Sequence, residues 1–422
     1  MENCTRAHDC GSVSLPGELI DHIISNVQAK ATLKACSLVC KDWVSLAQCF
    51  LFEKISLSDA THGVKRCQQL LPVLERSPHL IPYVRRLHLS FAHQSGMQRP
   101  TRRFLLSEPT LPDLLSLTRH IRTLQLGSSP STLKWTEIPL RLLHSLEPIL
   151  QLSTFQHLTM YGWEFIEPIE IFDFISFGQR TITSMKLRRV TTPDMPYSPW
   201  ITSWPTISFP NLENLEMPNT LMESMQRGLR TPNLRSLKLR LPVERSSAFS
   251  PFVEHLASSN ISDLSLRMIF TQFSGETPES FECFPDLTPC VQLQRLHLRF
   301  SFYTLFHDGD LRWAIKFLDH ISASTTFDVL ELDMRFYPRS GELDLWKDLA
   351  RALHQAWSMH AFRRASLGLI LPRYHGPKDP DDPRAINYAF HGELVGNLIG
   401  GVRDAMEELQ ATGSFQLQLL AA

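Results

Sequence analysis

The stretch Leu234–Leu239 reads LRSLKL, and its spacing of apolar residues returns along almost the whole chain. The pattern is an apolar residue, two variable residues, a second apolar residue, one variable residue and a third apolar residue. In the second half of each copy, apolar and variable residues alternate, which is typical of a short strand with one buried side. Eleven copies in tandem begin at residues 52, 84, 121, 155, 182, 212, 234, 261, 293, 327 and 362.

The copies recur every 22 to 37 residues, and several of the intervals have a helical pattern. Apolar residues three or four apart predict helices within 65–76, 247–259, 310–322 and 343–357. One strand and one return segment per period is similar to a leucine-rich repeat, in which parallel strands line the inside of a curved stack and helices the outside. Each unit has an apolar side that it cannot bury alone, so we expect neighbouring units to stack.

The repeats depart from regular leucine-rich repeats at one position. Regular repeats place an Asn three residues after the final Leu, and the early copies have Ala92, Ser129, Trp163 and Val190 there instead. Together with the uneven periods, this predicts an α/β fold in which an irregular solenoid has its parallel sheet on the concave face. A helix within 392–410 and a strand-like segment at 415–420 would cap the last apolar edge.

Ahead of the repeats, the stretch Leu15–Trp43 reads LPGELIDHIISNVQAKATLKACSLVCKDW and predicts two short amphipathic helices. Pro16 can open the first helix, because a missing N–H is harmless in a first turn. Two helices of this size cannot bury both apolar stripes on each other, so some of this surface must meet another protein or the rest of the chain. The stripes comprise Leu19, Ile20, Ile23, Ile24 and Val27 in the first helix and Leu33, Cys36, Val39, Cys40 and Trp43 in the second.

The order and spacing of these residues resemble an F-box of the fungal type. The resemblance implies a substrate-recruiting subunit of an SCF-type cullin ubiquitin ligase, which binds the Skp adaptor and thereby the cullin scaffold. The turn at 28–32 departs from the pattern, because it lacks the Pro or Asp that many F-boxes have there. The residues that would lie in the groove of the adaptor are Leu15, Pro16, Leu19, Ile20, Ile23, Leu33, Val39, Cys40 and Trp43.

This interpretation divides the chain into a disordered lead at 1–11, an F-box at 12–50 and a leucine-rich-repeat-like domain with a C-terminal cap at 51–422. Two alternatives stay open. The helix pair could simply cap the following domain, or the chain could be a protein-binding scaffold that holds the Skp adaptor without ubiquitin transfer.

Composition narrows the possible partners and compartments. The formal net charge is −1 and the pI is about 7.0, which argues against broad attraction to nucleic acid or to an anionic membrane. No apolar run approaches the ~20 residues that span a bilayer, and residues 1–11 lack the apolar core of a signal peptide. Six of the eight cysteines precede residue 68, which is a poor disulfide framework for a large extracellular chain. We therefore expect a reducing compartment, the cytoplasm or the nucleus.

The sequence has no motif that supports chemistry of its own. There is no Gly-rich phosphate-binding loop, no GxSxG motif and no HExxH motif, and the 17 histidines are scattered. Cys4, His8 and Cys10 lack a fourth metal ligand. We expect a non-catalytic protein without cofactor or metal, although an enzyme of unknown type on a repeat fold remains an alternative. A ligase receptor would act by placing its target beside machinery carried by other subunits.

The strands also suggest where a target could bind. In each copy, the variable residues beside the last two apolar residues point away from the core, and in the middle copies most of them are cationic. We predict a moderately basic inner face for an acidic or phosphorylated segment of a protein substrate; the alternative is a solvated strand face with assorted charges. Glu216 and Asp263 interrupt the run, and Glu331 and Asp333 end it. The candidate residues are Lys186, Arg188, Lys238, Arg240, Arg267, Arg295, His297 and Arg299.

A proline-rich insertion at 190–210 offers a second possibility. Its five prolines disfavour a helix, and Tyr197, Trp200 and Trp204 could anchor a partner. Alternatively, the segment replaces a helix of the stack and its tryptophans enter the core.

Overall fold

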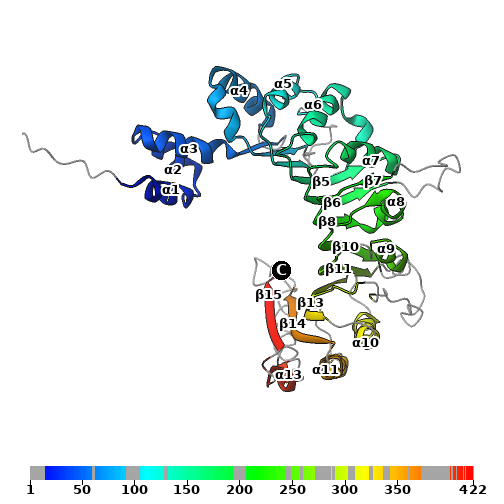
Figure 1. Cartoon of the computed structure of the whole chain (residues 1–422). Helices are drawn as coiled ribbons and strands as arrows, with labels where there is room; N and C mark the ends of the chain where they lie inside the picture. Colours follow the sequence, from blue (N-terminus) through cyan, green and yellow to red (C-terminus); the bar gives the residue numbers. More distant parts are fainter. Residues whose placement is uncertain are drawn as a thin grey trace, which may run out of the picture. The chain divides into compact units, whose positions relative to one another are not determined.

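The computed structural model alternates strands and helices along the chain (Figure 1). The chain divides into two compact units: unit 1 lies within Met1–Ser129 and Ile138–Phe155, and unit 2 within Pro130–Glu137 and Gln156–Ala422. The described residues are 15–58, 62–91, 105–127, 132–192, 206–242, 249–256, 260–270, 287, 290–302, 309–322, 327–335, 343–359, 361–371, 400, 403–404, 406–411, 413 and 415–421.

Parallel strands form one long sheet. Their order is β1-β2-β3-β5-β6-β8-β10-β11-β12-β13-β14-β15, with β4 paired to β5, while β7 and β9 form a separate two-stranded sheet. This strand order follows the sequence order, as expected for a stack of repeats. The strands are β1 (Lys54–Ser58), β2 (Arg86–Ser90), β3 (Thr123–Gly127), β4 (Leu133–Lys134), β5 (His157–Glu164), β6 (Ser184–Thr191), β7 (Ile207–Ser208), β8 (Asn214–Pro218), β9 (Leu229–Arg230), β10 (Ser236–Pro242), β11 (Asp263–Phe270), β12 (Arg295–Phe302), β13 (Phe327–Arg335), β14 (Phe362–Leu371) and β15 (Phe415–Ala421).

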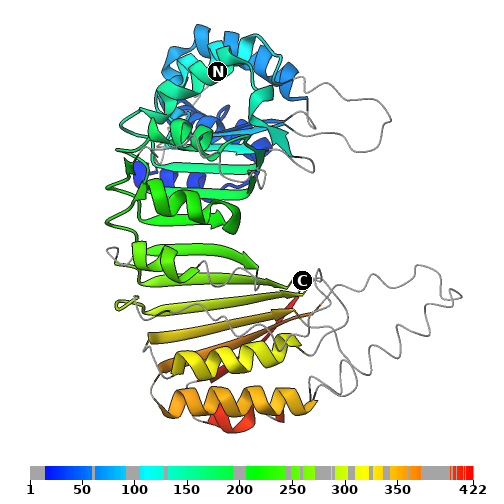
Figure 2. The ribbon, with the colours of Figure 1, turned by 90° about the vertical axis from the view of Figure 1, so that its right-hand side faces the viewer.

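Helices fill the intervals between the strands. The α-helices are α1 (Gly17–Ser25), α2 (Lys30–Cys36), α3 (Lys41–Glu53), α4 (Gly63–Arg76), α5 (Thr110–Leu117), α6 (Leu140–Leu150), α7 (Pro168–Ser176), α8 (Met222–Gly228), α9 (Phe249–Leu256), α10 (Gly309–Ser322), α11 (Leu343–Ser358) and α13 (Glu407–Ala411). Short 3₁₀ helices are η2 (Pro78–Tyr83), η3 (Trp135–Glu137) and η4 (Asn219–Leu221). In unit 2, α9, α10 and α11 lie along one face of strands β10–β14 (Figure 2). The described part of the chain places no helix on the other face of these strands, which in a solenoid of this kind is the concave face.

The α/β fold with one parallel sheet and leucine-rich-repeat-like stacking is confirmed. All eleven predicted strands are present, and nine of them begin two residues after the first apolar residue of their copy. In eight of these nine copies the first apolar residue is buried ahead of the strand, as with Ile121, Leu212 and Leu234. The motif therefore encodes one buried anchor and one alternating strand. The helices predicted within 65–76, 247–259, 310–322 and 343–357 correspond to α4, α9, α10 and α11.

A backbone ladder joins successive repeats of unit 2 just before their strands begin. The carbonyl oxygen of Thr183 accepts hydrogen bonds from the N–H groups of Glu213 and Asn214, at 2.9 and 3.1 Å. The carbonyl oxygen of Glu213 in turn accepts two from Arg235 and Ser236, both at 2.9 Å. The carbonyl oxygens of Arg235, Ser262 and Gln294 likewise each accept two backbone hydrogen bonds from the following repeat. The strands β8, β10, β11 and β12 are thus held in register at their first residues, and β13 at its second and third.

Of the four early copies that lack the usual Asn, the structure describes two at this position, and both residues are apolar. Trp163 and Val190 are both fully buried, so the core extends into this position. Trp163 packs edge-on against Trp135, with ring centroids 5.6 Å apart, and Trp135 also contacts Phe165 and Phe174. Ala92 and Ser129 lie outside the described residues.

The N-terminal prediction of two helices is wrong in one respect. The second predicted helix is two helices, α2 and α3, separated by a turn at 37–40. Cys40 immediately precedes α3 with extended backbone (φ −158°, ψ 169°), so the apolar stripe from Leu33 to Trp43 is not one helix face. The break allows three short helices to pack on one another.

Several predicted segments lie outside the described residues. They are the lead at 1–11, with Cys4, His8 and Cys10, and residues 193–205 of the proline-rich insertion, with Tyr197, Trp200 and Trp204. Most of the C-terminal helix predicted within 392–410 also lies there, and its described end includes α13. The final strand predicted at 415–420 is β15, which pairs in parallel with β14.

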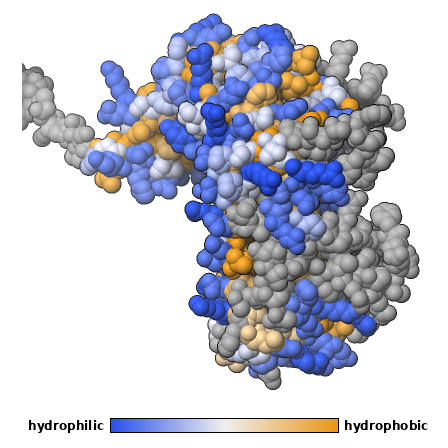
Figure 3. Space-filling model, turned by 45° about the vertical axis from the view of Figure 1, so that its right-hand side comes forward, coloured by the Kyte–Doolittle hydropathy of each residue, from blue (hydrophilic) through white to orange (hydrophobic). Residues whose placement is uncertain are grey.

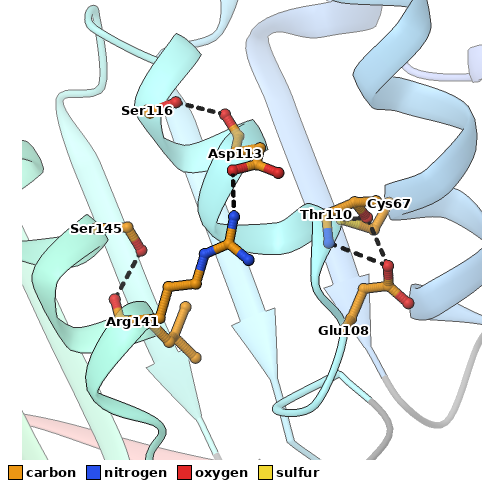
Figure 4. A network of polar contacts seen from close by, with 8 residues as sticks. Cys67, Glu108, Thr110, Asp113, Ser116, Arg141 and Ser145 are labelled. Atoms are coloured by element: carbon orange, nitrogen blue, oxygen red, sulfur yellow. Dashed lines mark hydrogen bonds and ion pairs between the residues drawn. The ribbon is translucent and has the colours of Figure 1, made fainter.

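A buried polar cluster holds α5 against α4 in unit 1 (Figure 4). Glu108 is 6% exposed, and its carboxylate accepts hydrogen bonds from Gln68 Nε2 (3.0 Å), Thr110 Oγ1 (2.7 Å) and the Thr110 N–H (3.2 Å). Thr110 Oγ1 also lies 3.4 Å from the sulfur of Cys67. A buried carboxylate needs such partners. The cluster therefore links the start of α5 to the preceding repeat.

Candidate partner-binding surfaces

The three N-terminal helices have a small core of their own. Ile20 and Ile24 on α1 and Leu33 on α2 are buried together, and Ile24 is completely inaccessible. Partly buried apolar residues complete this core: Val27, Trp43, Leu46, Phe50 and Leu51. Three short helices would not be stable without such contacts, so these residues are required for folding.

The same helices leave a second set of aliphatic side chains in water. Leu15 lies two residues ahead of α1, and Leu19 and Ile23 are four residues apart on one face of that helix. Their exposed fractions are 44%, 50% and 44%, and Leu38 and Val39, in the turn between α2 and α3, reach 86% and 63%. Figure 3 shows apolar side chains gathered over these helices. We call Leu15, Leu19, Ile23, Leu38 and Val39 the exposed aliphatic set.

The nine predicted adaptor-binding residues therefore separate into two groups. Ile20 and Leu33 are buried in the core of the three helices and Trp43 packs against it, so these three shape the surface and are not its outermost atoms. Leu38, the most exposed of the aliphatic set, is absent from the sequence prediction, because the turn that exposes it was expected to be helix. The predicted residues that are exposed are Leu15, Pro16, Leu19, Ile23, Val39 and Cys40.

The thiols of unit 1 differ in their surroundings. Cys40 is exposed beside Val39, whereas Cys67 is fully buried under the Glu108 cluster. Burial raises the pKa of the Cys67 thiol and also that of the Cys49 thiol on α3. The described cysteines are all free thiols: Cys36, Cys40, Cys49, Cys67 and Cys290.

The helix-free face of unit 2 places the predicted basic residues on neighbouring strands. Two of them are already neutralised locally. Arg188 on β6 donates from Nε and Nη2 to both carboxylate oxygens of Glu216 on β8, at 2.6 and 2.7 Å. These hydrogen bonds raise the pKa of Arg188 above its already high ordinary value. Arg295 lies between Asp263 and Glu331, with each N–O distance 3.8 Å.

His297 on β12 is likewise engaged. Its Nε2 lies 3.0 Å from Oδ2 of Asp333 on β13, and its Nδ1 lies 3.5 Å from the hydroxyl of Ser265 on β11. Asp333 therefore has a partner other than Arg299, which is its register neighbour.

Three arginines form a continuous row on this face. Arg240 of β10 pairs in register with Arg267 of β11, and Arg267 pairs with Arg299 of β12. Adjacent strands lie about 4.8 Å apart, so the three side chains stand side by side. Arg299 Nε is buried and has no hydrogen-bond partner within the described part of the chain. We call Arg240, Arg267 and Arg299 the arginine row; Lys238 lies on the same face of β10, two residues before Arg240.

One polar contact of this face was not predicted from sequence. Arg189 on β6 donates from Nη1 to the hydroxyl of Tyr161 on β5 at 2.8 Å, and its guanidinium carbon lies 5.4 Å from the centroid of the Tyr161 ring. Arg189 has φ 50°, an uncommon conformation for a residue other than Gly. Nothing in the strand motif signals this contact, because both strands depart from the motif there.

Alignment of the eleven copies could have anticipated the ion pairs. Lys186, Glu216 and Lys238 occupy the same motif position on β6, β8 and β10 and are register neighbours. Arg188 is two residues beyond Lys186, within reach of Glu216. The acidic residues that interrupt the basic run in sequence are therefore the ones that engage its members in the structure.

Other classes of site can be assessed within the described ranges. None of the described helices combines the length and the apolar character that crossing a membrane requires. In the same part of the chain, no group of three or more His, Cys, Asp and Glu side chains is arranged to hold a metal ion. Comparison of the chain with protein-family models and with curated proteins gives no match.

Proposed function

We propose that the chain is the substrate-recognition subunit of an SCF-type cullin ubiquitin ligase and is itself non-catalytic. The N-terminal helices bind the Skp adaptor, and through it the cullin scaffold, while the repeats hold a protein target. The observation that carries the proposal is the exposed aliphatic set, which occupies positions where the sequence resembles an F-box.

The separation of core residues from exposed residues in these helices supports this proposal. Ile20, Ile24 and Leu33 already provide the core of the three helices, so Leu19, Ile23 and Val39 are not needed to fold them. Large apolar side chains that gather on a surface without a folding role usually mark a protein interface. A receptor of this kind accelerates transfer by holding its target near the ligase, and it acts in the cytoplasm or the nucleus.

The proposal is tested by truncating the exposed side chains without touching the core. A variant with Leu19→Ala, Ile23→Ala and Val39→Ala loses three aliphatic contacts, each worth on the order of 1–2 kcal/mol when buried. We expect its affinity for the Skp adaptor to fall at least 100-fold. The matched control replaces Leu140 and Val291 with Ala, since these side chains are equally aliphatic, 70% and 86% exposed, and far along the sequence from α1.

Co-purification from cells completes the test. Recovery of both the Skp adaptor and the cullin with the wild-type chain, and loss of both from the triple variant, supports a ligase subunit. Recovery of the adaptor without the cullin favours the scaffold alternative. If the triple variant retains the adaptor while remaining folded, the F-box assignment is wrong.

A further inference from the structure

Ser265, His297 and Asp333 are in contact in that order across three neighbouring strands of unit 2. They lie on β11, β12 and β13, and Ser265 and His297 are register partners. Nε2 of His297 lies 3.0 Å from Oδ2 of Asp333, and Nδ1 lies 3.5 Å from the Ser265 hydroxyl oxygen. We call these residues the Ser–His–Asp cluster. Their order is that of a nucleophile, a base and a carboxylate that orients the base.

The carboxylate of Asp333 fixes the roles of the two ring nitrogens. An ionised carboxylate only accepts hydrogen bonds, so Nε2 of His297 is the donor to Asp333. In the neutral ring the proton is then on Nε2, and Nδ1 has the lone pair that faces the Ser265 hydroxyl. The side chains of His297 and Asp333 are only 26% and 21% exposed, and this burial strengthens the hydrogen bond between them.

The other acidic side chain beside His297 has a different partner. Glu331 is the register neighbour of His297 on β13, but its carboxylate lies 3.8 Å from Nε of Arg295. The carboxylate that contacts the ring comes from the diagonal position, Asp333. Each of the two acidic residues on this face of β13 therefore has its own cationic or donating partner.

A second Ser–His pair, in unit 1, shows what strand register alone produces. Ser56 on β1 and His88 on β2 are register partners, with 3.3 Å between the hydroxyl oxygen and Nδ1. Within the described residues no carboxylate contacts His88, and the neighbouring charge that acts on it is the cation Lys54. A serine beside a histidine is thus a consequence of register, whereas the orienting carboxylate distinguishes the cluster of unit 2.

We infer that Ser265 is an activated nucleophile and that the chain is acylated there by acyl thioesters. The inference does not depend on the proposed function. A thioester suits this site because a thiol has a pKa of about 8.5, so a thiolate is a good leaving group near neutral pH. An alkoxide is far more basic and would need a well-placed general acid in order to leave.

The acylation step needs no reactant other than the thioester. Ser265 Oγ forms a bond to the carbonyl carbon, and its proton passes to Nδ1 of His297. The carbon–sulfur bond then breaks, and the leaving sulfur takes the proton from Nδ1. The products are an ester on Ser265 and a free thiol. Asp333 does not touch the acyl donor; it is a positioning residue that holds the ring and stabilises its protonated form.

A donor for the developing negative charge lies on the same face. Arg299 follows His297 by two residues on β12 and is diagonal to Ser265 across the two strands. Its Nε is buried and has no hydrogen-bond partner among the described residues. Diagonal neighbours are within reach of long side chains. Arg299 therefore stabilises the acyl oxygen as that atom becomes negatively charged.

The test uses the purified full-length chain without the adaptor, at pH 7.5. The probe is the acetyl thioester of N-acetylcysteamine, and peptide mass spectrometry follows acetylation site by site. We expect Ser265 to react at least 100-fold faster than Ser56 in the same sample. His88 lacks an orienting carboxylate, Arg86, which is diagonal to Ser56, is bound to Glu53 at 3.2 Å, and one donor to the acyl oxygen contributes about 10²- to 10³-fold. This comparison needs no variant, so no folding defect can obscure it.

Variants of the cluster separate the roles of its members. His297→Gln is expected to slow acetylation of Ser265 at least 100-fold, whereas the matched control His88→Gln is expected to leave it unchanged. Asp333→Asn is expected to slow acetylation and to move its half-maximal rate to lower pH, because the charge that favours the protonated ring is lost. Asp333→Glu is expected to recover part of the rate. A purely structural role of Asp333 would not move the pH dependence.

Two results would overturn the inference. They are equal acetylation of Ser265 and Ser56, and acetylation of Ser265 that is as fast in a folded His297→Gln variant as in the wild type. Release of more than one acetate per chain would support the activated serine and would contradict the non-catalytic part of the proposed function. Because the Skp adaptor is absent from this assay, none of these results bears on adaptor binding by the N-terminal helices.

Discussion

Gly162 on β5 and Arg189 on β6 have the same left-handed backbone at the same level of two neighbouring strands, with φ of 72° and 50°. Both lie between the register pairs Tyr161 with Arg188 and Trp163 with Val190. The shared kink shifts the alternation by one residue, so that Trp163 and Val190 point into the core, as does the earlier Met160. Because both strands kink at the same level, they remain paired beyond the kink, as in a sheet with matched bulges.

The first prediction concerns the strain at Arg189. A left-handed residue other than Gly costs about 1 kcal/mol, so we expect Arg189→Gly to be more stable than Arg189→Ala by about that amount. Both variants lose the contact with Tyr161, so the difference reports the backbone alone. Urea denaturation of the two variants measures it.

Lys186 provides the control for this comparison, since it lies on the same strand within the regular part of the motif. There the order is expected to reverse, because Gly within a strand costs about 0.5–1 kcal/mol relative to Ala. Equal stabilities of the two Arg189 variants would show that the conformation is not strained.

Much of the fold could be predicted from sequence because the repeat motif is local and redundant. Leu264 and Leu266, for example, occupy the same positions as Leu237 and Leu239 and are their register partners. Departures from the motif could not be predicted in this way. The kink at Gly162 and Arg189 depends on two strands at once, and the turn at 37–40 interrupts a sequence that has helical periodicity.

The sequence predicted which segments form the candidate surfaces, but not which of their side chains are exposed or unpaired. A list of apolar positions does not distinguish Leu33, which is buried, from Val39, which is exposed, because both fit the same helical stripe. Similarly, the basic run in the sequence does not reveal that Arg188 is held by Glu216, while Arg299 Nε has no hydrogen-bond partner among the described residues. These distinctions depend on tertiary packing and on register across strands.

The second prediction separates core from surface in the N-terminal helices. Leu33→Ala removes a buried side chain and is expected to cost about 2–5 kcal/mol, whereas Leu38→Ala, at an 86% exposed position, is expected to change stability by less than about 0.5 kcal/mol. Hydrogen exchange of the α1–α3 amides measures both. Comparable loss of protection in the two variants would contradict the assignment of Leu33 to the core.

The third prediction concerns the buried carboxylate of Glu108. Glu108→Ala leaves Gln68 and Thr110 without their acceptor and is expected to destabilise unit 1 by about 1–3 kcal/mol. Glu108→Gln is expected to cost less, since its amide oxygen can accept from Thr110 while the Gln68 side chain rotates to present its own oxygen. Thermal denaturation ranks the two variants. If Ala and Gln have the same effect, the hydrogen bonds are not what holds α5 to α4.

The fourth prediction uses the cysteines of unit 1 as reporters. Cys40 is exposed and Cys67 is buried with a raised pKa, and only an accessible thiolate reacts readily. At pH 7.5 we expect iodoacetamide to modify Cys40 and to spare Cys67, as read by peptide mass spectrometry. Addition of the Skp adaptor is expected to protect Cys40, which adjoins Val39. Unchanged modification of Cys40 in a demonstrated complex would place the interface elsewhere.

The last prediction is a pH dependence that arises at His88 on β2. The side chain is half-buried, with Nδ1 3.3 Å from the hydroxyl of Ser56 on β1. Burial, and to a lesser degree the charge of Lys54, lowers the pKa of His88 below its ordinary value of 6.5. Between that lowered pKa and 6.5, the unfolded chain binds more protons at this position than the folded chain.

Stability therefore rises with pH through this window. The contribution of neutral His88 is fully present above pH 6.5 and is lost as the pH falls through the lowered pKa. His88→Gln cannot be protonated and can still bond to Ser56, so we expect its free energy of unfolding to fall less than that of the wild type between pH 7.5 and pH 5. Urea denaturation at both values gives the difference, in which the other titrating groups cancel. A variant as sensitive to acid as the wild type would show that His88 titrates alike in both states.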